Sequence, residues 1–341
     1  MSQSKSNPST SIIVVGYHGK EWIKPCLDSL VESFEQPEHV CLVDNSGNEG
    51  AIPETLDGCR YTLLKTDQPL GFAEANNFAL EELDAPERYI CFLNQDTLSR
   101  PGWIQRCAEL LDENPEIGAV TPMLFAFGWE LMNPNFYACM KANPELLELV
   151  DAGQELKPYY EVPNIPAAAM VIRSSVLAKV GPFDPVFGSY FEDFDLCCRV
   201  RQAGYQVGVC TTAEVAHYDS ITDAHINNAR NRRRQMLILR NKSIMDLREA
   251  GTARFVPLCR QFVSVFPRQL FRRLLGRPGA KSLRAIIKAY AGLLALSWRL
   301  LSAKRDHSIS QSFFQRFGER FAARFASEDK PTTESSEIPS T

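Results

Sequence analysis

The sequence lacks spaced cysteine pairs, an apolar leader and a long apolar run. Its ten cysteines include no Cys-x-x-Cys pair, and Cys41, Cys91 and Cys210 stand in strand-like runs. Such thiols behave as small apolar residues, so a reducing cytoplasm is favoured over secretion. The N-terminus carries no signal segment. The longest apolar stretch, 285–301, is interrupted by Lys288 and falls short of the roughly 20 apolar residues that span a bilayer.

The glycine pattern of a nicotinamide dehydrogenase is also missing. That class places Gly-x-Gly-x-x-Gly after its first strand. Here Gly16-Tyr17-His18-Gly19-Lys20-Glu21 stands at that point, with His18 and Glu21 where the second and third glycines belong. A dehydrogenase is therefore disfavoured, although the chain has the strand and helix pattern of an α/β protein.

Acidic residues are scarce in one part of the chain. Residues 230–305 hold nineteen Lys and Arg against two acids, whereas the whole chain has a net charge of −4. Such a block indicates an anionic partner. In residues 254–305 apolar and basic side chains interleave, which is typical of an amphipathic helix on a membrane surface. A helical cap with a merely solvated basic face remains the alternative. A nucleic-acid partner is not expected, because its aromatics would lie on a sheet or recognition helix.

Short β-branched runs alternate with helix-like segments from residue 11 to residue 217. We expect strands at 11–16, 40–43, 61–65, 89–93, 119–122, 167–173 and 208–212. We expect helices at 22–34, 71–83, 101–113, 174–180 and 193–203. The alternation predicts βαβ units and an α/β fold with a largely parallel sheet. Residues 125–165 are irregular and rich in Asn, Pro and aromatics, and we interpret them as a long functional insertion.

Composition divides the chain into four parts. Residues 1–10 are polar and predict a flexible arm, and residues 11–240 predict the α/β domain. Residues 241–327 form the basic amphipathic helical region, which we expect to associate with membranes. Residues 328–341 are acidic and rich in Ser, Thr and Pro, which predicts a disordered tail.

Two acidic clusters carry the chemistry of the first 220 residues. Asp96 follows the buried run Tyr89–Leu93, at the end of a strand where α/β sheets bind their ligands. Glu192, Asp193 and Asp195 crowd between aromatics, and like charges beside apolar groups raise a carboxyl pKa. A metal-binding acid together with a general base is suited to moving a group from a phosphate-bearing donor.

Seven motifs in order resemble the glycosyltransferase family 2 enzymes, especially the rhamnosyltransferase-like members that build bacterial surface polysaccharides. They are Tyr17 at a strand end, Val43–Ser46, Gly71–Asn77, Leu93–Thr97, Val180–Asp184, Phe191–Leu196 and His217. Each motif is weak alone, but the order is specific. The resemblance implies a GT-A fold, which is a Rossmann-like mixed sheet flanked by helices, followed by the basic helical extension. It also implies a nucleotide-diphospho-sugar donor, a divalent cation and inversion at the anomeric carbon.

The resemblance assigns the donor nucleotide to the first motifs. Asp44 would accept a hydrogen bond from a uracil or thymine ring, and Tyr17 would flank the base. Gly71 would open a helix whose N-terminus faces phosphate, with Asn76 as a donor contact one turn further on. Structural roles remain alternatives, because Asp44 also suits an Asx-turn and Tyr17 suits ordinary packing.

The same resemblance identifies Asp96 as the metal-binding acid of an Asp-x-Asp site in which Asn94 replaces the first acid. Mg²⁺ or Mn²⁺ prefers oxygen ligands and bridges phosphate oxygens. His217 would supply a second ligand, which favours Mn²⁺. A solvated turn acid and a structural histidine are the alternatives.

Asp193 is expected to be the general base that takes the proton of the acceptor hydroxyl. Glu192 would hold the acceptor or position Asp193. The alternative for Asp193 is an N-terminal helix acid favoured by the helix dipole. Asp195 suits an ion pair with Arg199 four residues later.

These features predict a cytoplasmic enzyme, peripheral on the inner face of the cell membrane. It would move a sugar, with rhamnose as the candidate, from a dTDP- or UDP-sugar to a hydroxyl of a lipid-linked or polysaccharide acceptor. The basic helices would hold it on the anionic leaflet. An inactive family member serving as a membrane- or glycan-binding scaffold is the alternative, because Asn94 stands in place of an acid.

Overall fold

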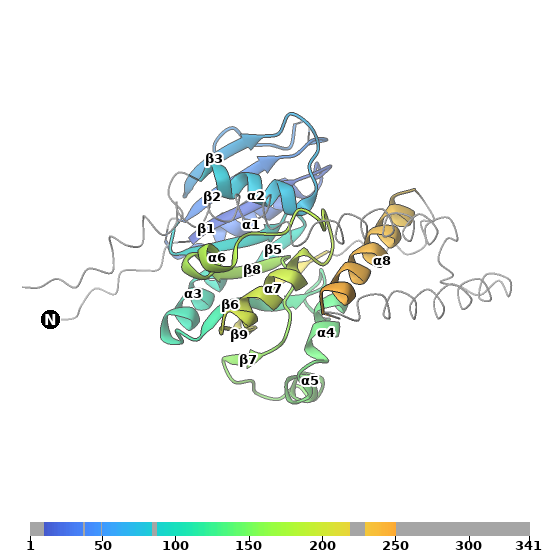
Figure 1. Cartoon of the computed structure of the whole chain (residues 1–341). Helices are drawn as coiled ribbons and strands as arrows, with labels where there is room; N and C mark the ends of the chain where they lie inside the picture. Colours follow the sequence, from blue (N-terminus) through green and yellow to red (C-terminus); the bar gives the residue numbers. More distant parts are fainter. Residues whose placement is uncertain (1–9, 37, 49, 84–86, 219–228, 250–341) are drawn as a thin grey trace, which may run out of the picture.

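The computed structural model describes residues 10–36, 38–48, 50–83, 87–218 and 229–249 (Figure 1). The expected arm up to residue 9 lies outside the described residues. The same holds for most of the expected basic helical region and for the expected tail, since the described chain ends at Glu249.

A nine-stranded mixed sheet forms the centre of the molecule (Figure 1). Its parallel part contains, side by side, β3 (Arg60–Lys65), β2 (His39–Asp44), β1 (Thr10–Gly16) and β4 (Tyr89–Asn94). Beyond β4 the order continues with β8 (Ala169–Arg173), β6 (Ile117–Phe125), β9 (Gln206–His217) and β5 (Thr97–Ser99). The strand β7 (Tyr159–Glu161) pairs with β9. The predicted α/β class with a mixed sheet is confirmed.

The sheet is less parallel than the alternation of elements predicted. The strand β8 runs antiparallel to both β4 and β6, and the short strands β5 and β7 run antiparallel to β9. Only β6 and β9 restore a parallel pair in this half. The three-residue β5 follows β4 directly and was not expected, because a strand so short shows no alternation in the sequence.

Helices pack against this sheet at the positions that the apolar periodicity predicted. They are α1 (Ile23–Glu32), α2 (Phe72–Glu82), α3 (Trp103–Glu113), α6 (Ser174–Val180) and α7 (Glu192–Gln202). In α1, Ile23, Cys26, Leu27 and Leu30 are buried, which is the one-faced pattern of an amphipathic helix. The helix α2 packs against β1 and β2, whereas α3 packs against β6 and β9.

The interpretation of residues 125–165 as irregular was partly wrong. This segment contains α4 (Pro134–Met140), α5 (Pro144–Asp151) and β7. Each helix begins with Asn followed by Pro, and the side chains of Asn133 and Asn143 accept hydrogen bonds from N–H groups of the first turn. Asn-Pro is a turn signal in isolation, but here it is an N-cap followed by a first-turn proline.

The core consists of the central strands and the inward faces of the helices. Ile12, Ile13, Leu42 and Phe92 are fully buried, as expected for strands covered on both faces. The nine cysteines in the described residues are free thiols, which confirms the expectation for that part of the chain.

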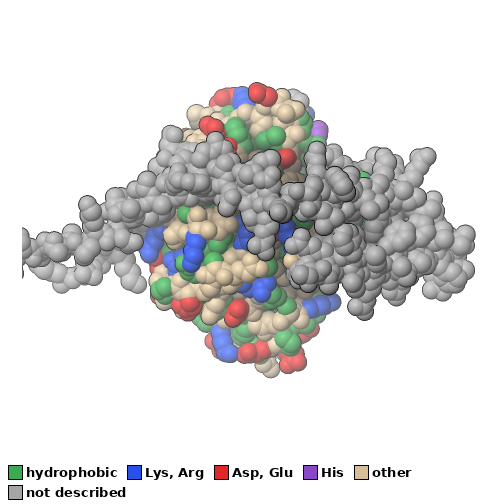
Figure 2. Space-filling model, in the orientation of Figure 1, with side chains coloured by type: hydrophobic (Ala, Val, Ile, Leu, Met, Phe, Trp, Pro, Cys, Tyr) green, Lys and Arg blue, Asp and Glu red, His purple; other side chains and the backbone are tan. Residues whose placement is uncertain are grey.

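The described surface carries charges of both signs. On the face shown in Figure 2, the visible Lys and Arg side chains are interspersed with Asp and Glu. Within the described residues, no helix is both long and apolar enough to cross a bilayer. The last described helix, α8 (Ala229–Glu249), continues through residue 240, where the domain boundary was expected.

Candidate active site

The carboxyl ends of three parallel strands bring the predicted donor-side residues to one edge of the sheet. In the strand register, Gly16 of β1 pairs with Asp44 of β2, and Val15 pairs with Asn94 of β4. Tyr17, Asp44 and Asn94 therefore lie beside one another, as the sequence predicted. This edge is where ligands of α/β sheets bind.

Asn94, Asp96 and His217 meet at this edge, although 120 residues of sequence separate the first two from the third. The Asp96 Oδ1 atom lies 3.3 Å from His217 Nε2, and Asn94 Nδ2 lies 3.1 Å from the same nitrogen. The unexpected strand β5 explains the meeting, because its Thr97 pairs with His217 of β9. The backbone N–H of Tyr218 also donates to the Asp96 carbonyl at 3.0 Å.

Two of these side chains carry atoms of the kind that bind divalent cations. The Asp96 carboxylate oxygen and the Asn94 amide nitrogen both contact the His217 imidazole nitrogen. Carboxylate and imidazole ligands together suit Mn²⁺, and Mg²⁺ keeps water or phosphate oxygens in its remaining positions. In the described part of the chain, no group of three or more His, Cys, Asp or Glu side chains converges on one point. A cation here would thus need further ligands from water or from a bound diphosphate.

Asp44 is held by a residue that the sequence analysis did not single out. The buried Asn48 donates from Nδ2 to Asp44 Oδ1 and to the Gly16 carbonyl, both at 2.7 Å. Its Oδ1 accepts from the Gly19 N–H at 2.8 Å. Asn48 therefore joins the ends of β1 and β2 and fixes the Asp44 carboxylate. It ends the Asp-Asn-Ser-Gly-Asn turn, which was the signal available in the sequence.

Tyr17 is fixed through its backbone rather than its ring. The Gln95 side chain accepts from the Tyr17 N–H and donates to the Tyr17 carbonyl, both at 2.9 Å. The ring is 36% exposed and packs edge-on against His18. Gln95 therefore connects Tyr17 with the segment that holds Asn94 and Asp96, because it lies between these two residues.

Gly71 lies against the segment 184–191 that precedes α7, which we name the catalytic loop because it leads to Asp193, the expected general base. A Cβ atom at Gly71 would stand 3.0 Å from the Gly188 carbonyl oxygen. The N–H groups of Gly71, Phe72 and Ala73 donate to Glu74 Oε2, Ser189 Oγ and Gly188 O. These three N–H groups already have partners, so the phosphate contact expected at this helix N-terminus does not enter the proposal below.

The neighbouring amides of α2 are buried and satisfied within the protein. Asn76 donates to the Phe72 carbonyl of its own helix at 2.9 Å. Asn77 bonds both backbone groups of Phe183, at 2.7 and 3.1 Å. Asn77 thus ties α2 to the start of the catalytic loop, whereas a donor contact by Asn76 stays a prediction.

Glu192 and Asp193 open α7 in two different environments. Asp193 Oδ1 accepts from the Phe194 N–H at 2.8 Å, and Oδ2 accepts from the Ala167 N–H at 3.3 Å. Burial raises the pKa of Asp193 to about 6 against these hydrogen bonds. Glu192 is 6% exposed, and its Oε2 atom has no hydrogen-bond partner among the described residues. Burial first, and then the Asp193 charge, raises the pKa of Glu192 well above its ordinary value.

Asp193 is linked to the Asn94 cluster through a short backbone segment. Ala167 donates to Asp193, and the carbonyl of the next residue, Ala168, accepts from the Asn94 N–H at 2.9 Å. Through these two neighbouring residues, Asp193 is connected to Asn94 at the carboxyl end of β4. The third acid, Asp195, forms the expected ion pair with Arg199 at 2.8 Å.

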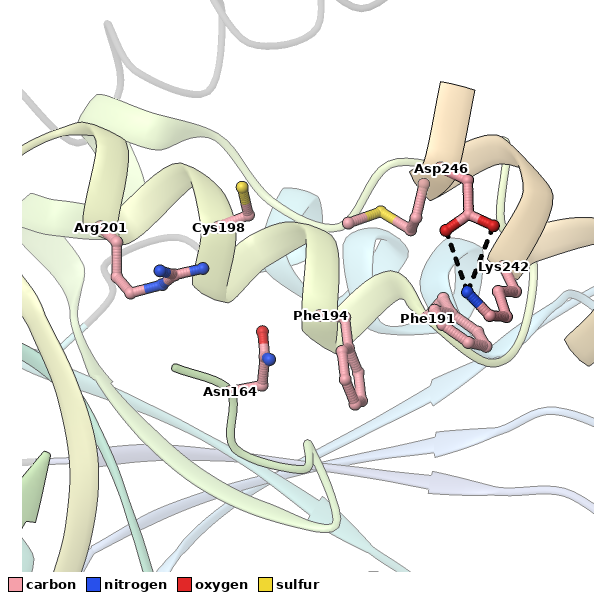
Figure 3. Close-up of a pocket in the computed structure, with 8 residues that line it drawn as sticks. Asn164, Phe191, Phe194, Cys198, Arg201, Lys242 and Asp246 are labelled. Carbon is pink, nitrogen blue, oxygen red and sulfur yellow. Dashed lines mark hydrogen bonds and ion pairs between the residues drawn. The ribbon is translucent and has the colours of Figure 1, made fainter. Parts of the chain in front are cut away.

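A cavity of about 230 Å³ lies beside the catalytic loop, between α7 and α8 (Figure 3). Phe191, Phe194 and Cys198 line it from the α7 side, and Lys242 and Asp246 form an ion pair on α8 (Figure 3). Asp193 does not line this cavity. The cavity therefore separates α7 from α8 and is not assigned to the reacting groups.

Comparison with known proteins agrees with this geometry. The sequence matches the family model for glycosyl transferase family 2 over residues 11–181. A pre-mycofactocin glycosyltransferase of Mycobacterium tuberculosis is 30% identical over 161 residues, which are 47% of this chain and 32% of that protein. The chain thus spans about a third of the length of that relative. An N-acetylglucosaminyl-diphospho-decaprenol L-rhamnosyltransferase of the same organism is 24% identical over 237 residues, 61% of this chain and 75% of that protein.

Two solved structures share the fold. A mannosyltransferase of Pyrobaculum calidifontis, in complex with GDP-Man and Mn²⁺, aligns with a TM-score of 0.55 at 17% identity, over 96% of this chain and 89% of that one. GalNAc-T7 with UDP, GalNAc and Mn²⁺ aligns with a TM-score of 0.53 at 11% identity, over 89% and 59%. These similarities confirm the predicted GT-A fold, and the family match shows that the chain belongs to glycosyltransferase family 2.

Proposed function

We propose that the protein transfers a sugar from a nucleoside diphosphate donor to a hydroxyl group of a lipid-linked or polysaccharide acceptor, with inversion at the anomeric carbon. One arrangement carries this proposal. The side chains of Asp96 and His217 contact each other at the edge of the parallel strands. Asp193 accepts a hydrogen bond from Ala167, whose neighbour Ala168 bonds Asn94 at the carboxyl end of β4. Binding groups for a diphosphate and a base for a hydroxyl are thus supplied by neighbouring elements.

Asp193 acts as the general base in this mechanism. The acceptor hydroxyl oxygen forms a bond to the anomeric carbon, the bond from that carbon to the diphosphate oxygen breaks, and the hydroxyl proton passes to an Asp193 carboxylate oxygen. A base with a pKa of about 6 is ionised at neutral pH and is a better proton acceptor than an ordinary aspartate. Direct displacement of this kind inverts the anomeric configuration.

Glu192 serves a different purpose because its carboxyl group keeps a proton while Asp193 is ionised. A neutral carboxyl group both donates and accepts hydrogen bonds. Its buried Oε2 atom is available to a bound hydroxyl group. We assign Glu192 to holding the acceptor or the transferred sugar next to Asp193.

Asp96 and His217, with Asn94 beside them, would hold Mn²⁺ or Mg²⁺. When bound, the cation supplies positive charge to the leaving diphosphate. Asp44 would accept a hydrogen bond from the uracil or thymine ring, and the exposed Tyr17 ring would flank that base. The assignment of a dTDP- or UDP-sugar, and of rhamnose as the sugar, follows the resemblance of the motifs to rhamnosyltransferase-like enzymes.

The lipid-linked acceptor is supported by the relative whose name specifies a decaprenol diphosphate acceptor. The nineteen Lys and Arg of residues 230–305 provide charge for an anionic membrane surface, where such an acceptor lies. We therefore place the protein on the cytoplasmic face of the membrane as a peripheral protein. Binding to anionic vesicles that weakens with rising salt would support this placement, and equal binding to neutral vesicles would contradict it.

Donor binding tests the proposal directly. UDP-, GDP- and dTDP-sugars are titrated by calorimetry in the presence of Mn²⁺ or Mg²⁺, with Asp96→Asn and Asp28→Asn as the matched variants. Asp28 is an exposed carboxylate of α1 that pairs with Lys24, away from the site. We expect one nucleotide sugar to bind in a metal-dependent manner, with binding lost in Asp96→Asn and kept in Asp28→Asn. If no nucleotide sugar binds while anionic vesicles or glycans do, the scaffold alternative replaces the transferase.

A further inference from the structure

The catalytic loop is held from outside the sheet by one buried amide of α8. The Asn241 side chain is fully buried, and its Nδ2 atom lies 2.8 Å from the Phe187 carbonyl, 2.9 Å from that of Ser189 and 2.6 Å from that of Tyr190. An amide nitrogen carries two hydrogens, so these three acceptors share them. Removal of this side chain would leave buried carbonyl groups without a donor, which is costly in any protein interior.

The neighbours of Asn241 on α8 extend this contact. Arg240 donates to the Phe187 carbonyl at 3.1 Å and, from Nε, to Asn241 Oδ1 at 2.9 Å, which orients the amide. Two turns later, Arg248 forms ion pairs with Asp184 in the catalytic loop and with Asp195 in α7. The helix α8 thus contacts the catalytic loop at its beginning (Asp184), in its middle (Phe187) and near its end (Tyr190).

The opposite side of the loop meets the donor side of the site. The Gly188 carbonyl accepts from the Ala73 N–H at 2.8 Å, and Ser189 Oγ accepts from the Phe72 N–H at 3.2 Å. The loop is therefore clamped between α8 and the N-terminus of α2. A displacement on the α8 side moves the acids of α7 relative to the strand edge that carries Asp44 and Asn94.

The backbone of the loop needs this support. Tyr190 and Phe191 have φ angles of 73° and 75°, a left-handed conformation that is unfavourable for bulky side chains. Such residues keep that conformation only where surrounding contacts impose it. Asn241 bonds the Tyr190 carbonyl directly, at the point where the chain turns into α7.

The apolar contact between α8 and the catalytic loop is separate from the main core. Among the described residues, Phe187, Leu239 and Ile244 form a small buried cluster there, with Val186, Phe191, Met236 and Met245 packed against it. The cavity of about 230 Å³ further separates α8 from α7 (Figure 3). The placement of the loop thus depends on directional polar contacts, chiefly those of Asn241.

We propose that Asn241 is a positioning residue for the transfer reaction, because it holds the catalytic loop so that Glu192 and Asp193 face the donor edge of the sheet. The inference rests on the proposed function. It adds to that function a residue of α8 that touches neither the donor-side nor the catalytic side chains.

Steady-state kinetics of the full chain test it, with Asn241→Ala compared with Ser243→Ala. Ser243 is an equally buried polar residue of α8 whose hydroxyl donates to Leu239 in the same helix at 2.9 Å. We expect kcat of Asn241→Ala to fall roughly 10- to 100-fold, as for a small misplacement of reacting groups. The midpoint of the acid side of its pH–rate profile should move below pH 6. Water that reaches Asp193 would reduce its burial and so lower the pKa of its carboxyl group. The ionisable groups facing Asp193 are Glu192 and Cys197 of α7 and Cys139 of α4, and none of them is altered.

Arg248→Gln provides a second variant, at a side chain that is 37% exposed rather than fully buried. It should shift kcat and the acid limb in the same direction, by less. Unchanged kcat and pH profile in both variants would overturn the proposal, and so would an equal loss in Ser243→Ala. A wild-type protein that transfers no sugar would instead contradict the proposed function itself.

Discussion

At the scale of single residues, two adjacent carboxyl groups have opposite tasks. Asp193 must lose its proton to act as a base, and burial raises its pKa to about 6. We predict that kcat/KM rises with pH, is half-maximal at about pH 6 and levels off roughly one pH unit higher, because the ionised form of the free enzyme is the active one. Asp193→Asn should lower kcat roughly 10²- to 10⁴-fold across that range. Initial-rate measurements from pH 4.5 to 8 check both points, and a variant that keeps the wild-type kcat would remove Asp193 from the mechanism.

Glu192 gives the contrasting prediction. Since its carboxyl group is protonated while Asp193 is ionised, Glu192→Gln replaces one neutral hydrogen-bonding group by another of similar shape. We expect Glu192→Gln to keep kcat within roughly tenfold of wild type at pH 7, whereas Glu192→Ala loses much more. Both variants are assayed beside Asp193→Asn. A loss in Glu192→Gln as large as that in Asp193→Asn would mean that Glu192 works as an anion.

The residues proposed to react were visible in the sequence, but the residues that hold them were not. Asp96, His217 and Asp193 stand in motifs whose order is visible in the sequence. Asn48, Gln95 and Asn241 act through hydrogen bonds to backbone groups 29, 78 and 54 residues away. A polar residue in a turn or on a helix has no sequence pattern that reveals such distant partners. Their roles follow only from the packing of the folded chain.

At the scale of elements, Gly71 lies so close to the catalytic loop that one added methyl group should disturb the contact. A Cβ atom at Gly71 would lie 3.0 Å from Gly188 O and 3.1 Å from Gly188 Cα. We expect Gly71→Ala to push the loop by a few tenths of an ångström and to lower kcat roughly tenfold. Its N-cap φ of −68° suits alanine, so backbone strain does not contribute.

Gly118→Ala is the matched control for this prediction. A Cβ atom there would meet Tyr205 Cβ and Val200 Cγ1 at 2.9 Å, near the far end of α7 from the catalytic loop. Both variants should unfold at lower temperature, but only Gly71→Ala should lose turnover. If kcat falls in both variants in the same proportion to the fall in melting temperature, Gly71 matters for stability alone.

Element prediction succeeded for most of the sheet and for the helices packed on it. The helix Ser174–Val180 was expected at its observed bounds, and β1, β2, β3, β4 and β8 within one or two residues, whereas β6 and β9 end three and five residues later than expected. The strand β5 has three residues, and α4 and α5 are helices of seven and eight residues that begin with Asn-Pro. Segments so short are formed by their caps and tertiary contacts rather than by an amphipathic pattern. The antiparallel direction of β8 likewise depends on its pairing with β4 and β6, which are distant in the sequence, so no local pattern reveals it.

At the scale of the whole molecule, the stability of the sheet depends on two ionisable residues at the edge opposite the site. Glu38 is 6% exposed, and its carboxylate accepts from the Thr10 N–H at 2.6 Å. Burial and Glu87 raise its pKa to about 7. His39 beside it contacts Arg60 at 2.7 Å, and burial followed by this charge lowers its pKa to about 4. His39 begins β2 and Glu38 immediately precedes it, so their titration affects global unfolding.

The signs of the two contributions are opposite. The folded protein binds a proton at Glu38 more tightly than the unfolded chain, so this contribution to the free energy of unfolding is full below about pH 4.5 and is lost as pH rises to about 7. The folded protein disfavours protonated His39, so its contribution is lost as pH falls from about 6.5 to about 4. Between these values the two effects largely cancel.

Glu38→Gln should separate them. The amide oxygen can still accept from Thr10, while the buried charge is removed, so we expect the free energy of unfolding at pH 8 to rise by roughly 2–3 kcal/mol. At pH 4.5 the variant and the wild type should be nearly equal, because wild-type Glu38 is then protonated in the folded state. The difference in stability between the variant and the wild type should grow from about pH 4.5 to about 7 and then level off, because the other titrating groups are common to both proteins. Urea unfolding at pH 4.5, 6 and 8 measures this, and a variant that is no more stable than wild type at pH 8 would contradict it.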